Sequence, residues 1–173
     1  MEIRHIESGD QDRLARFLER VPAADRTFFK EDVDDPQASH EWTQPGPGRT
    51  IAVEDGEVVG WLAVVRKPGW SSHVGEVRLI VDPAHRGRGI GRTLARRGVL
   101  EALDLGLDKM VVEVIAVQEP TIAMFRSLGF EPEALLTDHV RDRNGDLRDL
   151  MVLSHSVQEQ WSTMIMAGIA DDV

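Results

Sequence analysis

The segment that decides the fold is VDPAHRGRGIGRTLARR, residues 81–97, in which three glycines stand at alternate positions among five arginines. It follows an apolar run from Val74 to Val81 and precedes a stretch of helical apolar spacing from Ile90 to Leu105, so it predicts a strand, a tight turn and a helix. The first turn of a helix presents unpaired N–H groups and the positive end of the helix dipole, which favour a bound phosphate. Glycines allow the backbone to approach such a ligand, and arginines beside it can bind phosphate oxygens. The segment therefore predicts a site for a diphosphate group.

Two common phosphate-binding patterns do not fit this turn. A Walker loop needs Gly-Lys followed by Ser or Thr, and the sequence contains no such triplet. The dinucleotide fingerprint G-x-G-x-x-G/A ends on an arginine when it is begun at Gly87 and on a leucine when it is begun at Gly89. The spacing that does occur is Arg86-x-x-Gly89-x-Gly91. A nicotinamide-dependent oxidoreductase is therefore disfavoured.

The flanking sequence predicts alternating helices and strands that begin with a helix. Asp55-Gly56 and Asn144-Gly145 each lie between apolar runs, which is a strong hairpin signal. This order of elements predicts an α/β fold with a mixed sheet, in a single layered domain over residues 1–173. The expected elements are a helix over Ser8–Val21, strands over Thr50–Val53, Val58–Val65 and Val74–Val81, a helix over Ile90–Leu105, a strand over Met110–Val117, a helix over Pro120–Leu128, and strands over Leu135–Arg141 and Leu147–His155.

The tail, residues 156–170, carries apolar residues at roughly helical spacing, and Ser156 and Glu159 have the spacing of a capping box. It predicts a C-terminal helix extension of the domain. Its apolar stripe fits a core or docking face, with a homodimer contact as the alternative.

Composition narrows the class of protein. The 173 residues include no cysteine, which excludes disulfides, thiolate metal sites and a cysteine nucleophile. The start of the chain lacks the apolar core of a signal peptide, and no run approaches the roughly 20 apolar residues of a membrane span. We therefore expect a cytoplasmic protein without a membrane partner. The net charge of −10 argues against nucleic-acid binding and favours a cationic small molecule or basic peptide as partner. His139 and His155 are too isolated from other ligands to predict a metal site.

The glycine turn, together with a second segment, resembles the GCN5-related N-acetyltransferase superfamily. Arg86-x-x-Gly89-x-Gly91 is similar to the family's Q/R-x-x-G-x-G/A signature for the pyrophosphate of acetyl-coenzyme A, and QEPTIAMFRSLGF (residues 118–130) is similar to its N-x-x-A-x-x-(L/M)-Y-x-x-x-G-F segment. The resemblance runs from about Thr50 to Leu153. It implies a mostly antiparallel mixed sheet, splayed between its fourth and fifth strands and flanked by helices. It also implies an N-acetyltransferase that uses acetyl-coenzyme A as acyl donor, a primary amine as acceptor and no metal.

The resemblance also implies a set of cofactor-binding residues. Backbone groups at the end of the strand before the turn would pair with the pantetheine arm as an added strand would, and the N–H groups of the turn would bind the pyrophosphate. An N–H near Val81 would polarise the thioester carbonyl. The implied residues are Leu79, Ile80, Val81, Arg86, Gly87, Arg88, Gly89, Ile90, Gly91, Arg92, Gln118 and Phe125.

The second segment departs from the family pattern at two positions. Phe125 stands where many members carry a tyrosine that protonates the leaving thiolate, and Gln118 stands at the asparagine position. The chain has no tyrosine that could substitute. A second reading therefore remains open, in which the chain is a non-catalytic module that binds coenzyme A or acyl-coenzyme A as a sensor or partner-binding domain.

Two carboxylates compete for the role of proton acceptor. Glu113 lies on the strand before the second segment, at a position that the similar ribosomal-protein N-terminal alanine acetyltransferases use for this role. Glu76 lies on the strand before the glycine turn, near the place of a catalytic glutamate in other members. Partial burial suits a carboxylate to take a proton from an ammonium group. For each residue the alternative is a solvent-facing strand position.

Other residues are candidates for the surroundings of the acceptor, among them the polar residues of the last hairpin, which in similar proteins borders the acceptor cleft. For the polar residues of that hairpin, a solvated strand face is the alternative. The residues concerned are His73 as a proton relay, Trp42, Trp61 and Trp70 as walls of the pocket, and Asp138, His139, Arg141 and Asp142 on the hairpin. For His73 the alternative is a histidine with its hydrogen bonds satisfied within its loop, and for Trp61 it is a core position in its strand.

Overall fold

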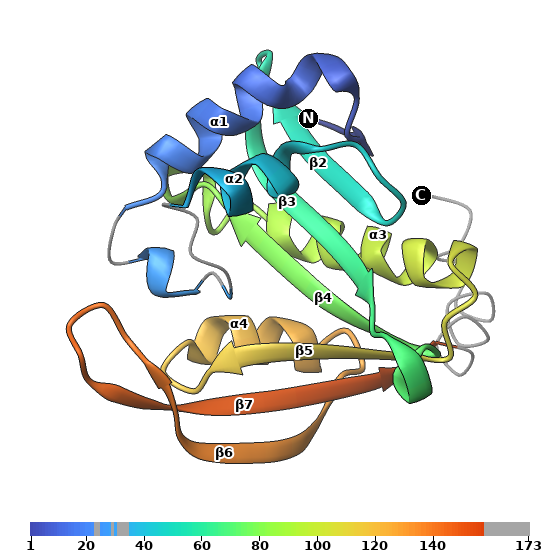
Figure 1. Ribbon diagram of the computed structural model, residues 1–173, viewed down its shortest axis with the longest axis vertical. Helices are drawn as coiled ribbons and strands as arrows, with labels where there is room; N and C mark the ends of the chain where they lie inside the picture. Colours follow the sequence, from blue (N-terminus) through green and yellow to red (C-terminus); the bar gives the residue numbers. More distant parts are fainter. Residues whose placement is uncertain (23–24, 29, 31–34, 158–173) are drawn as a thin grey trace.

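The computed structural model describes residues 1–22, 25–28, 30 and 35–157 (Figure 1). In this part of the chain seven strands form one sheet in the order β1-β2-β3-β4-β5-β7-β6, and the neighbours run antiparallel except for β4 and β5. This is the mixed, mostly antiparallel α/β fold that the sequence predicts. The elements are β1 (Glu2–His5), η1 (Ser8–Asp10), α1 (Gln11–Arg20), η2 (Asp25–Phe28), α2 (Pro36–Thr43), β2 (Arg49–Glu54), β3 (Glu57–Arg66), η3 (Gly69–Ser71), β4 (Val74–Val81), η4 (Pro83–His85), α3 (Ile90–Asp104), β5 (Lys109–Ile115), α4 (Glu119–Arg126), β6 (Glu131–Arg141) and β7 (Leu147–Ser156).

Both predicted hairpins are present, but the prediction that the chain begins with a helix is wrong. Asp55 and Gly56 have φ of 51° and 81° at the turn from β2 to β3, and Gly145 has φ of 91° in the turn from β6 to β7. The chain begins with β1, which pairs with β2 from Glu2 opposite Val53. This edge strand contains four residues and one apolar side chain, so it gives no alternating pattern that could be recognised.

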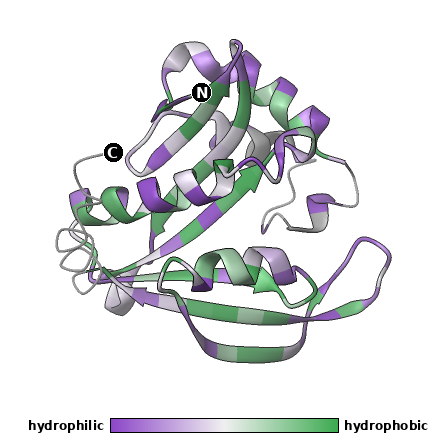
Figure 2. Cartoon of the chain, turned by 180° about the vertical axis from the view of Figure 1, so that it is seen from behind, coloured by the Kyte–Doolittle hydropathy of each residue, from purple (hydrophilic) through white to green (hydrophobic). Residues whose placement is uncertain are grey.

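Helices cover both faces of the sheet and define two apolar clusters (Figures 1 and 2). On one face, α3 and α4 pack on β3, β4 and β5 through residues such as Leu94, Val99 and Phe125. On the other face, α1 and α2 pack on β2 and β3 through Phe17 and Trp42. The predicted C-terminal helix lies, after residue 157, outside the described residues.

The sheet is splayed between β4 and β5, as expected. The two strands pair over four positions, from Val74 opposite Lys109 to Val77 opposite Val112. Beyond Val77 both strands continue but no longer pair, and in Figure 1 they diverge toward the carboxyl end of β4. The split therefore opens at the end of β4 that leads into the glycine turn.

Candidate active site

A cavity of about 1120 Å³ lies where β4 and β5 diverge. It is lined by β4 from Glu76 onward, by the glycine turn, by β5, by one face of α4, and by the β6–β7 hairpin. Of the residues that the resemblance implies for cofactor binding, all but Arg88 line this cavity. Sequence segments far apart in the chain thus meet at one place.

The glycine turn presents a row of unused backbone donors to the cavity. Gly87 and Gly89 have φ of 75° and 84°, a left-handed conformation that other residues adopt only with strain. The first hydrogen bond into α3 runs from the N–H of Thr93 to Gly89 O, at 3.0 Å. The N–H groups of residues 87–92 donate to no acceptor within the described residues. Such a row, at the positive end of a 15-residue helix, fits a diphosphate.

Most arginines around the turn bind carboxylates of the protein itself. Arg86 lies 2.8 Å from Asp25 Oδ2, and its Nε donates to Val81 O at 3.3 Å. Arg88 donates to both oxygens of Glu54 at 2.8 Å, beside a separate pocket near the amino terminus. The Arg88 side chain is therefore directed away from the cavity, and its proposed role is confined to its backbone N–H.

The backbone of β4 also presents donors to the split. Two hydrogen bonds join the ends of β4 to the β3 side of the sheet: the N–H of Asp82 donates to Val59 O, and the N–H of Lys67 donates to Val74 O, each at 2.9 Å. They place the even-numbered residues of β4 on the β3 side. Leu79 and Val81 therefore direct their N–H groups toward β5, at positions where β5 no longer pairs. An extended ligand could bind there as an added strand.

Glu76 and Glu113 lie together, one on each side of the split. Lys30 Nζ is 3.0 Å from both Glu76 carboxylate oxygens and 2.9 Å from Glu113 Oε2. Lys67 Nζ lies 3.3 Å from Glu76 and 3.9 Å from Glu113, and Arg78 Nε donates to Glu76 at 3.2 Å. The Glu76 side chain is 8% exposed and that of Glu113 is 25% exposed. Neither is the solvated strand position that was the alternative.

The cations of this cluster differ in their electrostatic environment. Burial alone would lower the pKa of Lys30, but its hydrogen bonds to Glu113 and Glu76 outweigh that effect and leave the pKa raised. Burial lowers the pKa of Arg78, against the opposing charge of Glu113. Lys30 is therefore held as an ammonium ion between two carboxylates, which is the arrangement that a primary amine acceptor would need.

The second segment lines the cavity with Gln118 at its start and with Phe125 on α4. Gln118 is the N-cap of α4, makes no capping bond with its side chain and lines the cavity. Phe125 is 1% exposed and packs edge-on against Phe130, with ring centroids 5.1 Å apart, while still lining the cavity. A phenyl ring thus stands where a tyrosine hydroxyl would reach the cavity.

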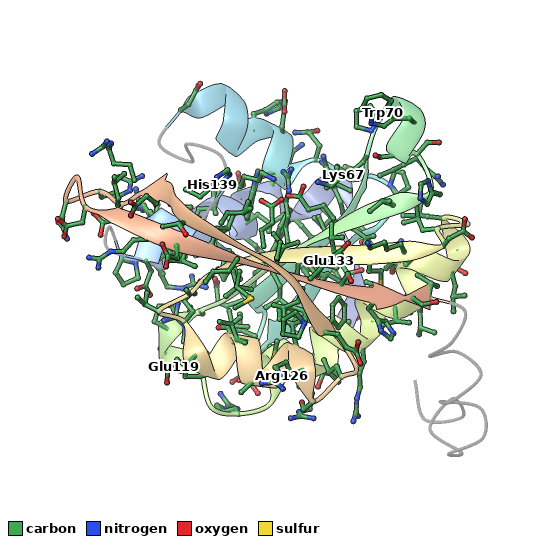
Figure 3. The ribbon with its side chains drawn as sticks, turned by 90° about the horizontal axis from the view of Figure 1, so that it is seen from below. Lys67, Trp70, Glu119, Arg126, Glu133 and His139 are labelled. Carbon is green, nitrogen blue, oxygen red and sulfur yellow. The ribbon has the colours of Figure 1, made fainter. Side chains whose placement is uncertain are left out.

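The aromatic and hairpin residues expected around the acceptor divide into two groups. Trp42 and His139 line the cavity, and Trp42 stacks on Trp61 at 3.7 Å between centroids. Trp61 itself is buried in the core and does not line the cavity, as its alternative reading had it. Trp70 is 97% exposed and does not line the cavity, so its assignment to the pocket wall is wrong. Its loop places it outside the sheet, and Figure 3 shows it projecting away from the other labelled residues. His73 is exposed and also lies outside the lining.

Sequence reasoning did not single out Lys30, which is central to the cluster. Its neighbourhood in the sequence has no motif, although the chain contains only three lysines, and that scarcity was an available signal.

Figure 3 shows Lys67 on the same side of the sheet as His139 and opposite Glu119 of α4, which indicates the face on which the cluster lies. Among the described residues there is no group of three or more His, Asp or Glu side chains that could hold a metal ion, and no helix long and apolar enough to cross a membrane.

Comparison with known proteins identifies the family. The sequence model of the Acetyltransferase (GNAT) family matches residues 15–130. The uncharacterized N-acetyltransferase YjgM of Escherichia coli K12 is 27% identical over 135 residues, 75% of this chain and 81% of that protein. Streptothricin acetyltransferase of Streptomyces lavendulae is 36% identical over 76 residues, 44% of this chain and 40% of that protein.

Solved structures of N-acetyltransferases have the same fold as this chain. A GCN5-related N-acetyltransferase from Kribbella flavida superposes with a TM-score of 0.77 at 26% identity, over 90% of this chain and 96% of that chain. The Salmonella typhimurium acetyltransferase yncA with its cofactor acetyl-CoA has a TM-score of 0.71 at 21% identity, over 90% and 93% of the two chains. The chain belongs to the GNAT family, and it is an N-acetyltransferase.

Proposed function

We propose that the protein transfers an acetyl group from acetyl-coenzyme A to a primary amine by direct attack of the amine on the thioester. The observation that carries this proposal is the continuity of one cavity. It joins the unused N–H groups of residues 87–92, the unpaired edge of β4 and the Glu76–Glu113 pair. Along the split, the diphosphate, the pantetheine arm and the amine would each contact a complementary surface, in that order.

The described residues supply groups that would bind each part of acetyl-coenzyme A. The N–H groups of residues 87–92 would bind the pyrophosphate, with Arg92 of the cavity lining beside them. The N–H groups of Leu79 and Val81 would bind the pantetheine arm, and the one at Val81 would donate to the acyl carbonyl oxygen. When bound, the cofactor supplies an activated acyl thioester. Gln118 and Phe125 would line its far side from α4.

The protein's part in the chemistry is to orient the amine and take its proton. The two carboxylates would bind the acceptor as an ammonium ion, which places it beside the split. We assign proton removal to Glu113, because Glu76 is engaged by three cations within 3.3 Å whereas Glu113 is more exposed to the cavity. Glu76 would then hold the ammonium in place.

Turnover with a panel of amines tests the proposal against the binding-only alternative. Release of free thiol from acetyl-coenzyme A would be followed with spermidine, an aminoglycoside, a lysine peptide and peptides with free amino termini. Steady turnover with any of them supports transfer. Micromolar binding of coenzyme A without turnover on the whole panel would favour a sensor or partner-binding module.

A pair of variants tests the assignment of the base. We expect Glu113→Gln to lower kcat about 100-fold at neutral pH, since general-base catalysis contributes roughly 10² to 10⁴, while the Kd of coenzyme A stays within a few-fold. We expect Glu76→Gln mainly to raise the KM of the amine. The reverse pattern would exchange the two roles, and an unchanged rate in both variants would remove the pair from the mechanism.

A further inference from the structure

The chain contains three lysines, and they occupy very different places. Lys109 lies on the surface, where its Nζ contacts Glu133 at 2.6 Å. Lys30 and Lys67 both contact the Glu76–Glu113 pair. Every other position counted as Lys or Arg is arginine, whose guanidinium stays protonated and is a poor nucleophile. Two of the three side-chain amines of the protein are thus placed at the carboxylates of its acyl-transfer site.

Lys30 lies where an acceptor amine is expected. Its Nζ makes three hydrogen bonds of 2.9–3.0 Å to the two carboxylates, and the residue lines the cavity together with the unpaired end of β4. Lys67 reaches the same carboxylates from farther away, at 3.3 and 3.9 Å, and does not line the cavity. Of the three lysines, Lys30 alone both contacts the two carboxylates closely and lines the cavity.

We propose that Lys30 is itself an acyl acceptor and that the protein acetylates it at Nζ. This inference rests on the proposed function. In the balanced step, the ammonium group of Lys30 loses a proton to Glu113, and the free amine forms a C–N bond to the acyl carbonyl carbon. The C–S bond breaks, its electron pair leaves on sulfur, and the second amine proton is released to a carboxylate or to the thiolate. Lysine ammonium and acetyl-coenzyme A thus become acetyl-lysine, coenzyme A thiol and one proton.

The amine of Lys30 must be neutral to attack, so its proton must first pass to a group in the site. The charged groups that face Lys30 among the described residues are Glu76 and Glu113, with Lys67 and Arg78 behind them. The raised pKa of Lys30 keeps it protonated near neutrality. Because that proton passes to Glu113 within the site, the reactive form carries the same number of protons as the resting ion pair, and we expect the initial rate of Lys30 acetylation to change by much less than tenfold per pH unit near neutrality.

Peptide mapping after incubation with isotope-labelled acetyl-coenzyme A, without any amine, tests the proposal. We expect Lys30 to acquire the label at least about tenfold faster than Lys109, because the bound thioester is held beside it, and with a first-order rate that does not depend on protein concentration. Lys109 reports ordinary chemical acetylation in the same sample. A Lys109→Arg variant should label at Lys30 as the wild type does. Labelling of Lys30 no faster than that of Lys109 would overturn the proposal.

A second measurement needs no turnover. Reductive methylation with ¹³C keeps the charge of each lysine and gives each dimethyl-lysine its own NMR signal. Addition of coenzyme A, which carries no acyl group, should shift the Lys30 signal and leave that of Lys109 in place. An unmoved Lys30 signal in protein that binds coenzyme A by calorimetry would show that Lys30 is not beside the cofactor.

Failure of this proposal can be told from failure of the proposed function. If calorimetry detects no binding of coenzyme A, the proposed function falls, and this inference with it. If coenzyme A binds and an external amine is acetylated while Lys30 stays unlabelled, only the inference about Lys30 falls.

Discussion

Replacing Gly89 by alanine tests whether the backbone N–H groups of the glycine turn bind the diphosphate. The same replacement at Gly56, a glycine of matching conformation, controls for the strain that alanine introduces. Gly89 has φ of 84° and Gly56 has φ of 81°, and an added Cβ would meet nothing within 4 Å at either position. An L-residue in this conformation costs about 1–2 kcal/mol. For a chain of this length that loss lowers Tm by roughly 2–8 °C, and it should be the same for both variants.

The effect on cofactor binding should differ between the two variants. Gly89 lines the cavity and is followed by unused N–H groups, whereas Gly56 lies in the β2–β3 turn outside the cavity lining. A hydrogen bond to a charged group is worth about 1.5–3 kcal/mol. Displacing a phosphate oxygen from one such donor should raise the Kd of coenzyme A by roughly 10- to 100-fold in Gly89→Ala.

The assay pairs calorimetric titration of coenzyme A with thermal unfolding of the free proteins. Gly56→Ala is expected to bind as the wild type does while melting at the same temperature as Gly89→Ala. If both variants lose stability equally and Gly89→Ala still binds coenzyme A with unchanged affinity, the turn is not the diphosphate site, and the reasoning from its backbone is refuted.

Three further outcomes are expected. Asp10 accepts two hydrogen bonds from Arg4, which lower its pKa from 3.8 to about 2, so its contribution of about 2 kcal/mol is present above pH 3.8 and is lost as the pH falls toward 2. In urea unfolding, the deficit of Asp10→Asn should therefore shrink between pH 5 and pH 2. Phe125→Tyr should fold and change turnover by less than about threefold, since a thiol of pKa about 8.5 leaves readily as thiolate; a larger gain would show that thiolate protonation limits the rate. Glu101→Leu leaves the partners of a 2%-exposed carboxylate unpaired and should cost about 3–5 kcal/mol, against less than about 1 kcal/mol for the exposed Glu57→Gln; equal losses would contradict this.

The fold could be predicted where local rules act strongly. Positive φ at Gly56 and Gly145 is required by the two hairpins, and the long helix after the glycine turn has clear apolar spacing. The strand β1 could not be predicted, because its four residues gain their place from pairing with β2 and from the ion pair of Arg4 with Asp10. Likewise β6 begins at Glu131, earlier than expected, since Pro132 is tolerated on an edge strand at a register shift.

In the candidate site, too, the residues that are adjacent in sequence could be predicted, and those that tertiary structure brings together could not. The glycine turn is continuous in sequence, so its residues could be named together from the spacing alone. Glu76 and Glu113 could be named but not paired, because their proximity depends on the register of β4 and β5. Lys30 could not be placed at all, since it reaches the pair from a segment between α1 and α2 that has no periodic pattern.

The charges that line the cavity also change what can be inferred about the acceptor from the net charge of the chain. The chain carries −10 overall, yet arginines outnumber carboxylates among the described residues that line the cavity. Under the proposed function, a preference for a cationic acceptor would therefore rest on Glu76 and Glu113 rather than on the surface field. Because Lys30 contacts both carboxylates, an ammonium acceptor that binds there under the proposed function would have to displace it, and its apparent affinity would fall by the fraction of molecules in which Lys30 stays in place. Lys30→Met should thus lower the KM of a cationic amine while leaving the affinity for coenzyme A unchanged, and steady-state kinetics with spermidine would measure both the direction and the size of that competition.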